Sequence, residues 1–409
     1  MSTKRVVITG IGAVCPVGNT VEEAWTGVMN GKCGIDRITH FDLTDYKVTL
    51  GAELKDYEYP DKREARRMDP FCQYGMSAAR EALDMSGLIA GENIDATRIC
   101  VYVGSGIGGI VTHEKEVLLA AREGVRRVSA LLVPMIIGNI LPGQIAIANG
   151  FKGSALSVVT ACSCGTNAIG EAWRAIRHGY ADAVVAGGAE APFAPASMAG
   201  FVNMKAMNGT EDKTRASIPF DKERAGFIMG EGAGILILEE YEHAKARGAN
   251  ILAEVTGYGS SCDAYHITAP SPEGEGASAA MRMAIESAGV APSDISYINA
   301  HGTSTPLNDL YETRAIKNVF GASAYDIPIS STKSMTGHML GAAGAVEAVF
   351  CVKAILTGKV PPTIGYQVPD EELDLDYVPG TARDVSVQYT LSNSLGFGGH
   401  NATIIFKRY

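Results

Sequence analysis

Hydrophobic positions along the chain follow two alternating patterns, one typical of buried strands and one typical of helices. Short apolar runs that predict strands cover residues 6–9, 99–103, 183–186, 235–238, 295–299 and 402–406. Between these runs, apolar residues recur every three or four positions, as in residues 21–28, where Asn19 or Thr20 is placed to cap a helix. Strands that alternate with helices predict an α/β fold in which helices cover the sheets.

A faint internal repeat connects two of the predicted helices. Gly165, followed by Ala-Ile at 175–176 and Gly179, recurs as Gly344, followed by Ala-Ile at 354–355 and Gly358. Both helices have almost no polar face, which is typical of buried helices. The repeat indicates two similar halves packed around a shared helix pair.

Composition and charge argue against several classes of protein. The chain has 409 residues, of which 46% are hydrophobic and 20% are charged, and this is typical of a globular protein larger than one small domain. A net charge of −10 argues against nucleic acid, which usually needs a basic face. Glycines and a proline interrupt residues 6–16, which argues against a signal peptide, and polar residues interrupt the apolar stretch 128–148, which argues against a membrane span.

The 8 cysteines are scattered through mostly apolar segments. This distribution favours free thiols in a reducing compartment over disulfides, so we expect a cytoplasmic protein. Cys162 and Cys164 have no second Cys or His pair at ligand spacing, and we therefore expect no zinc or other metal site.

Cys162 is the first candidate for chemistry. It follows the β-branched run at 158–160, and after it Ile169, Ala172, Trp173 and Ile176 have helical spacing, which predicts a strand, a tight turn and a helix. Free backbone N–H groups and the helix dipole favour a thiolate at such a junction, and a thiolate suits covalent acyl transfer. This segment alone leaves a buried, unreactive cysteine as the alternative.

Two later segments place histidines next to polar loops. His301 follows the predicted strand 295–299 and precedes a loop rich in hydroxyl groups, and strand ends of α/β sheets are where ligands bind. His338 and Lys333 lie in a polar stretch before an apolar helix, so we expect both to face a polar pocket. Glu347 in that helix needs a buried partner, and Lys333 is the natural candidate. Residues 393–401 form a glycine-rich turn whose backbone N–H groups are suited to an oxyanion hole.

Together these segments resemble the β-ketoacyl-[acyl-carrier-protein] synthases, most closely the elongating type II condensing enzymes of bacterial fatty-acid synthesis. The resemblance runs from VVITGIG at 6–12, through FDKERAGF at 220–227 and DAYH at 263–266, to GFGGHN at 396–401. It implies the five-layered αβαβα fold of the thiolases, built from two pseudo-repeated halves. Residues 1–250 would carry the nucleophile and residues 251–409 the two histidines. It also implies a homodimer with no cofactor, whose partner is acyl-carrier protein.

The resemblance assigns roles to individual residues. Cys162 becomes the nucleophile, His301 and His338 the histidine pair, and Lys333 the family lysine with Glu347 as its acidic partner. The residues expected to meet the substrate are the aromatic gate Phe397, the hydroxyls of Thr303 and Thr305 that hold a phosphopantetheine arm, and Ile107, Met135, Phe227 and Gly398. The basic residues expected to dock the acidic carrier protein are Lys62, Arg63, Arg66, Arg67, Arg126, Arg127 and Lys205. Cys164 departs from the family, because Ser, Thr or Gly is common there.

The implied reaction is a decarboxylative condensation. Loss of CO₂ from a malonyl thioester gives an enolate without a strong base, and neutral His301 and His338 would donate N–H groups to its oxygen. The backbone N–H groups of Cys162 and Phe397 would hold the oxyanion formed when Cys162 attacks an acyl thioester. The product is a 3-oxoacyl carrier protein that is two carbons longer.

Other functions remain to be weighed against this one. Residues 104–109 fit G-x-G-x-x-G after a predicted strand, which is a weak signal for a dinucleotide site. A thiolase would carry a second cysteine near residues 396–401, and a starter condensing enzyme would carry Asn in place of His338. A type II polyketide ketosynthase shares the three central residues, whereas a non-catalytic chain-length factor usually lacks the nucleophile.

Overall fold

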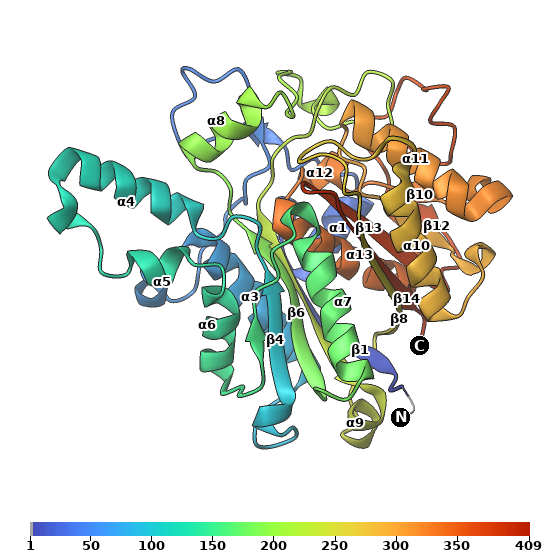
Figure 1. Cartoon of the computed structure of the whole chain (residues 1–409), viewed down its shortest axis with the longest axis horizontal. Helices are drawn as coiled ribbons and strands as arrows, with labels where there is room; N and C mark the ends of the chain where they lie inside the picture. Colours follow the sequence, from blue (N-terminus) through green and yellow to red (C-terminus); the bar gives the residue numbers. More distant parts are fainter. Residues whose placement is uncertain (1–2) are drawn as a thin grey trace.

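Ten strands form one continuous sheet in the order β10-β9-β13-β14-β8-β1-β7-β6-β4-β5 in the computed structural model, which describes residues 3–409 (Figure 1). The first five strands in sequence are β1 (Val6–Val14), β4 (Ile99–Gly104), β5 (Ala155–Leu156), β6 (Ala183–Glu190) and β7 (Gly232–Glu240). The other five are β8 (Ala253–Cys262), β9 (Tyr297–Asn299), β10 (Ile329–Ser330), β13 (Tyr389–Gly396) and β14 (His400–Lys407). Two small hairpin-like sheets pair β2 (Asp36–Arg37) with β3 (Leu50–Gly51), and β11 (Lys359–Val360) with β12 (Arg383–Asp384).

The strand pairing repeats itself on the two sides of the β1–β8 junction. On one side β1 and β6 pair antiparallel with β7, and β4 pairs parallel with β6 and β5. On the other side β8 and β13 pair antiparallel with β14, and β9 pairs parallel with β13 and β10. The same connectivity therefore occurs twice, as the internal repeat in the sequence indicated. The division at residue 250 stays a prediction.

Five layers are stacked around one buried helix pair. The helices α7 (Cys164–Arg177) and α13 (Ala343–Thr357) contact each other and lie between the two halves of the sheet, while α3 (Pro70–Ser86) covers the outer face of the first half and α10 (Glu275–Ala288) that of the second (Figure 1). These two central helices are the ones that carry the repeat. The expected αβαβα fold is confirmed.

The remaining α-helices lie on the outside of these layers or connect them. They are α1 (Val21–Met29), α2 (Lys62–Ala65), α4 (Ile110–Glu123), α5 (Leu132–Ile136), α6 (Ile140–Asn149), α8 (Pro195–Asn203), α9 (Tyr241–Ala246), α11 (Pro306–Phe320) and α12 (Lys333–Thr336). The side chain of Thr20 caps α1, which confirms the second of the two caps that the sequence offered. Among the described residues, only the segment Leu340–Thr357 is long and apolar enough to span a membrane, and 89% of it is buried inside the protein.

One expected strand is absent. Residues 158–160, before Cys162, form no strand, and the strand that pairs with the outer side of β4 is the short β5 (Ala155–Leu156). The N–H of Thr160 donates to the sulfur of Cys164 at 3.1 Å instead of to a neighbouring strand. The β-branched run therefore leads into a turn and does not extend the sheet.

Candidate active site

Cys162 lies in a tight turn at the start of the buried helix α7. The turn is a single 3₁₀ turn (Ala161–Ser163), whose first residue, Ala161, has a left-handed conformation with φ of 51°. The sulfur of Cys164 and the carbonyl of Thr160 accept hydrogen bonds that hold this turn. Cys164 is 0% exposed and its sulfur faces the backbone of the turn, whereas Cys162 lines a cavity.

The two histidines reach the same cavity from the second half of the sheet. His301 follows β9, and the backbone N–H groups of His301 and Gly302 donate to the buried carboxylate of Glu312 at 2.7 and 2.8 Å. The backbone of His338 is bridged to Met229, beside β7. The imidazole rings meet edge to face with centroids 5.3 Å apart. The sequence-predicted trio of Cys162, His301 and His338 is thus brought together.

Both imidazoles are neutral in the folded protein. Burial, followed by the positive charge of Lys333, lowers the pKa of His301 and of His338 well below 6.5. In each ring Nδ1 is buried, and no partner for it is found within residues 3–409. Nε2 is therefore the ring nitrogen that is available to a ligand in the cavity. A neutral imidazole that carries its proton there is a hydrogen-bond donor.

Lys333 and Glu347 form the buried pair that the sequence predicted. Nζ of Lys333 contacts Oε1 of Glu347, and both side chains are 1% exposed. Burial raises the pKa of Glu347, and the lysine opposes this. Lys333 does not line the cavity, so its charge acts on the site from behind the histidines.

The expectation of a resting thiolate is wrong. Burial raises the pKa of the Cys162 thiol to about 12, although the charge of Lys333 and the backbone N–H groups of Phe397 and Cys162 oppose this. Burial also raises the pKa of Cys164 to about 12, so acidity does not separate the two thiols. Loss of water from the sulfur outweighs the helix terminus, and Cys162 rests as a neutral thiol.

The cavity holds about 940 Å³, its open mouth included, and most of its wall is apolar. The sequence-predicted residues that line it are Cys162, His301, His338, Phe397, Thr303, Thr305, Ile107 and Phe227. Oγ1 of Thr303 and Oγ1 of Thr305 lie 3.0 Å apart, which places two hydroxyl groups side by side in the wall. Phe201, which the sequence did not indicate, packs against Phe227 and Phe397 with ring centroids 5.7 and 6.4 Å away.

Two expected substrate-binding residues do not line the cavity of this single chain. Gly398 occupies the turn after Phe397 with φ of 84°, and its N–H donates to the carbonyl of Ile267 at 2.8 Å. Met135 lies in α5, where its carbonyl packs against Gly109, so it supports the loop from behind. Contact of Met135 with the substrate stays a prediction.

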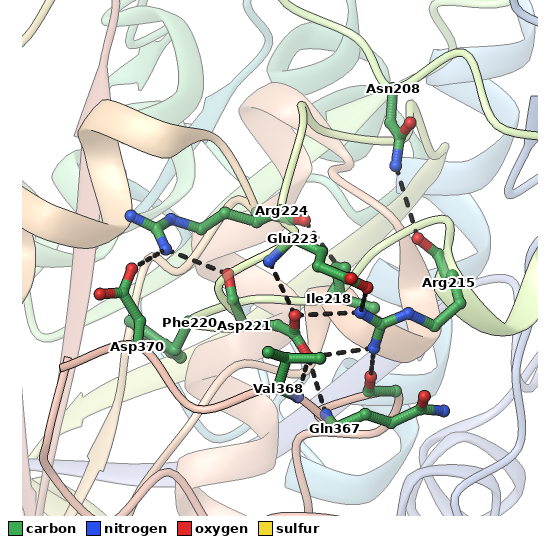
Figure 2. A network of polar contacts seen from close by, with 12 residues as sticks. Asn208, Arg215, Ile218, Phe220, Asp221, Glu223, Arg224, Gln367, Val368 and Asp370 are labelled. Carbon is green, nitrogen blue, oxygen red and sulfur yellow. Dashed lines mark hydrogen bonds and ion pairs between the residues drawn. The ribbon is translucent and has the colours of Figure 1, made fainter.

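A charged network fixes the segment that delivers Phe227 to the cavity. Figure 2 shows the guanidinium of Arg215 between Asp221 and Glu223, and that of Arg224 reaching Asp370. Burial tends to raise the pKa of Asp221, but Arg215 and three backbone N–H groups outweigh it and lower that pKa to about 2. The motif at 220–227 is therefore a positioning element for the cavity wall.

Glu190 is a buried residue at the cavity that the sequence analysis missed. It ends β6, which runs four residues past the predicted strand, and it accepts hydrogen bonds from the backbone N–H groups of Gly106 and Ile107. A dinucleotide phosphate would need the backbone N–H groups of this glycine-rich loop, but those of Gly106 and Ile107 already donate to Glu190. The loop therefore does not have a free phosphate cradle.

The seven expected docking cations are all exposed. Four belong to α2 or directly follow it, two precede α5, and Lys205 follows α8 with φ of 55°. Arg127 pairs with Glu123, the last residue of α4, at 3.1 Å, whereas the other six form no ion pair within residues 3–409. Among residues 3–409, no group of three or more His, Cys, Asp or Glu side chains is arranged to hold a metal ion.

Sequence comparison decides the family. Residues 3–244 match the beta-ketoacyl synthase N-terminal domain, and residues 252–367 match the beta-ketoacyl synthase C-terminal domain. The chain belongs to the β-ketoacyl synthases. It is 52% identical to 3-oxoacyl-[acyl-carrier-protein] synthase 2 of Staphylococcus aureus (strain COL) over 409 residues, which covers 99% of each chain. It is 50% identical to the protein of the same name from Synechocystis over 413 residues, covering 100% of this chain and 99% of the relative.

Solved β-ketoacyl synthases have the same fold. A type II polyketide ketosynthase in complex with its acyl-carrier protein superposes with a TM-score of 0.93 at 35% identity, covering 100% of both chains. A β-ketoacyl synthase from Burkholderia phymatum superposes with a TM-score of 0.92 at 33% identity, covering 99% of this chain and 100% of that one. The match to solved β-ketoacyl synthases therefore includes the segments that line the cavity, among them those with Cys162 and Phe397.

Proposed function

We propose that this β-ketoacyl synthase elongates acyl chains in fatty-acid synthesis by condensing an acyl group on Cys162 with a malonyl group on acyl-carrier protein. The observation that carries this proposal is the convergence of a thiol and two neutral imidazoles in one largely apolar cavity. The thiol can hold the acyl group, and the imidazoles can each donate a hydrogen bond to an enolate oxygen.

In the first half-reaction Cys162 exchanges thioesters with the acyl carrier. The sulfur bonds to the acyl carbonyl carbon, the bond to the carrier sulfur breaks, and the thiol proton ends on the departing carrier thiol. Because Cys162 rests as a thiol, a base must take that proton first, and a neutral imidazole in the same cavity can relay it. The N–H groups of Cys162 and Phe397, which lie against the sulfur, are placed to stabilise the oxyanion.

In the second half-reaction the malonyl carboxylate leaves as CO₂, and the bonding electrons form an enolate. His301 and His338 stabilise the enolate oxygen through Nε2–H, and their low pKa keeps them as neutral donors at neutral pH. The enolate carbon then bonds to the acyl carbonyl carbon, the bond to Cys162 breaks, and the sulfur takes up one proton. A thiol pKa of about 12 makes that reprotonation favourable at neutral pH.

A fatty-acid substrate is favoured over a polyketide substrate by sequence identity. The chain is 52% identical to a 3-oxoacyl-[acyl-carrier-protein] synthase 2, but only 35% identical to the type II polyketide ketosynthase that superposes on it. A non-catalytic chain-length factor is disfavoured, because Cys162 is present and lines the cavity. The condensation uses no metal and no redox cofactor, since both substrates arrive as thioesters on a carrier arm.

We also propose acyl-carrier protein as the partner and a homodimer as the assembly. One structural relative is a ketosynthase in complex with its acyl-carrier protein, and the exposed cations of this chain suit an acidic partner. The sheet ends at β5, an exposed edge strand that includes Leu156, and further large apolar side chains are exposed in the segment around it: Val125, Val133, Ile147 and Val159. An unpaired edge and an apolar face favour pairing with a second copy. A cytoplasmic location follows from these partners.

An elongation assay tests the proposed function. The protein is incubated with malonyl-carrier protein and with acyl-carrier proteins of increasing chain length, and the products are weighed by mass spectrometry. We expect 3-oxoacyl products that are two carbons longer, together with release of CO₂, and no 3-oxoacyl product from Cys162→Ala. A wild-type protein that binds the carriers but forms no such product with any chain length would contradict the proposal.

A further inference from the structure

Glu190 is a buried carboxylate at the cavity to which the proposed mechanism assigns no step. It is 0% exposed and lines the same cavity as Cys162. Its Oε1 accepts hydrogen bonds from Oγ of Ser105 at 2.7 Å and from the N–H of Ile107 at 3.1 Å. Its Oε2 accepts from two further backbone N–H groups, those of Gly106 at 2.7 Å and of Gly341 at 3.0 Å.

These donors come from two separate walls of the cavity. Ile107 belongs to the loop between β4 and α4, whereas Gly341 belongs to a 3₁₀ turn (Leu340–Ala342) that leads into α13. Leu340 lines the cavity two residues after His338 and has φ of 46°. A branched residue is unfavourable in that conformation, so its neighbours must hold it there. The bond from Gly341 to Glu190 is one such restraint.

The two walls are packed too closely around this carboxylate for a side chain at position 341 or 106. A Cβ atom on Gly341 would lie 2.6 Å from Oε2 of Glu190 and 2.7 Å from the backbone nitrogen of Gly106. A Cβ atom on Gly106 would lie 2.9 Å from the same oxygen. The loop, the turn and the end of β6 therefore meet at the carboxylate of Glu190.

We propose that Glu190 is a positioning residue with two effects. It fixes the loop that contains Ile107 and the turn that contains Leu340 relative to each other in the wall of the acyl cavity, and it keeps a negative charge beside Cys162. Burial raises the pKa of Glu190, but its four donors oppose this, and three of them are backbone N–H groups, which can only donate and therefore favour an ionised carboxylate. Burial is the main cause of the high pKa of the Cys162 thiol, and the charge of Glu190 adds to it. The acyl cavity in this inference rests on the proposed function.

Glu190→Gln tests both halves of the inference, because it keeps the shape of the side chain but removes its charge and one acceptor oxygen. We expect the rate at which octanoyl-acyl-carrier protein acylates Cys162 to fall about tenfold, as for one lost buried hydrogen bond. We expect alkylation of Cys162 by iodoacetamide at pH 8 to become faster, because loss of the negative charge lowers the thiol pKa. Both rates are read by mass spectrometry of the peptide that contains Cys162.

Two further variants separate this role from general destabilisation. Ser105→Ala removes one of the four donors to Glu190, and with it the acceptor of the Gly108 N–H, but it keeps the charge, so acylation should slow while alkylation stays unchanged. Glu239→Gln is the matched control, because Glu239 is also 0% exposed but lies at the other end of the sheet, where Ala183 pairs with it. This control should change neither rate in the folded protein.

Opposite changes of the two rates in Glu190→Gln would support the inference. A fall in both rates, or an unchanged rate of acylation, would overturn it, and Ser105→Ala decides the wall-positioning half if Glu190→Gln does not fold. A wild-type protein that octanoyl-acyl-carrier protein does not acylate would contradict the proposed function instead. The alkylation comparison needs no acyl carrier, so it would still decide whether Glu190 places its charge on the thiol.

Discussion

Lys333 and Glu347 neutralise each other in a closed pair directly behind the catalytic cavity, with each side chain 1% exposed. Burial is the main cause of the pKa shifts of Cys162, His301 and His338, and the lysine charge acts on all three, opposing the rise for Cys162 and adding to the fall for the histidines. Its partner Glu347 lies on the central helix α13. The buried helix α13 therefore holds, through Glu347, the lysine whose charge influences the protonation of the site.

Removing one member of this pair should be costly, because the other is left as an unpaired buried charge. We expect Lys333→Met to lower the free energy of unfolding by about 3–5 kcal/mol. The double variant Lys333→Met/Glu347→Leu should recover most of that loss, since neither charge remains. Urea unfolding followed by circular dichroism measures both values. A double variant no more stable than the single one would show that the ion pair is not what Lys333 contributes.

The histidine pair should matter most for the decarboxylation step. Replacing His301 or His338 with Ala removes one donor to the enolate oxygen, and we expect release of CO₂ from malonyl-carrier protein to slow by about 10²–10³. Acylation of Cys162 should slow much less, because one imidazole remains to relay the thiol proton. The two steps are measured separately as CO₂ released and as acyl-enzyme formed. Equal losses in both steps would contradict this division of roles.

The low pKa of the imidazoles predicts how stability depends on pH. The folded protein keeps His301 neutral well below 6.5, whereas the unfolded chain takes up a proton there. The stability that His301 contributes is therefore complete above pH 6.5 and is lost as pH falls toward the folded pKa. Between pH 6 and pH 5, wild type should lose about 1 kcal/mol more unfolding free energy than His301→Asn.

Because other buried groups also titrate, the quantity to measure is the difference in unfolding free energy between wild type and His301→Asn. Burial raises the pKa of Glu312 to about 7 and that of Asp69 to about 6, and both groups favour the folded state as pH falls. They are present in wild type and in His301→Asn, so their effect cancels in the difference. Urea unfolding at several pH values gives that difference, and parallel pH curves for the two proteins would contradict a neutral buried His301.

Charge reversal tests the docking surface. We expect Arg63→Glu/Arg67→Glu and Arg126→Glu/Arg127→Glu to raise KM for carrier-bound substrates several-fold and to flatten its dependence on salt, with a much smaller change in kcat. Lys359→Glu is the control, because Lys359 is about half exposed on β11, outside the expected surface. Steady-state kinetics from 50 to 300 mM salt would separate the two. An unchanged KM would show that these arginines are ordinary solvent-exposed residues that do not dock the carrier protein.

The sequence predicted the central chemistry because each reactive residue lies in a short motif at an element boundary. Cys162, His301 and His338 are far apart along the chain, and local patterns alone could not place them in one cavity. The resemblance to a known family supplied that step, and the pairing of strands around β1 and β8 explains it physically. The acidity of Cys162 could not be predicted, because burial is a tertiary property that outweighs the local helix terminus.

Two features of the site that local sequence patterns do not reveal have the same physical cause. Residues 158–160 have the composition of a strand, yet the N–H of Thr160 bonds to Cys164 and the segment turns. Glu190 lies four residues beyond the predicted strand 183–186, so its only sequence signal was an acid that ends a run of small and apolar residues. In both cases the decisive partners come from the tertiary arrangement, in which Gly341 is far away in the sequence from Glu190.

The central claim is that Cys162, and not its neighbour Cys164, carries the acyl group. Incubation with octanoyl-acyl-carrier protein, rapid digestion and mass spectrometric sequencing of the peptide spanning both thiols would locate the adduct, with Cys164→Ser as the matched control. We expect an octanoyl thioester on Cys162 alone, in wild type and in Cys164→Ser, and no adduct in Cys162→Ala. An octanoyl group on Cys164, or acylation that persists in Cys162→Ala, would contradict the account.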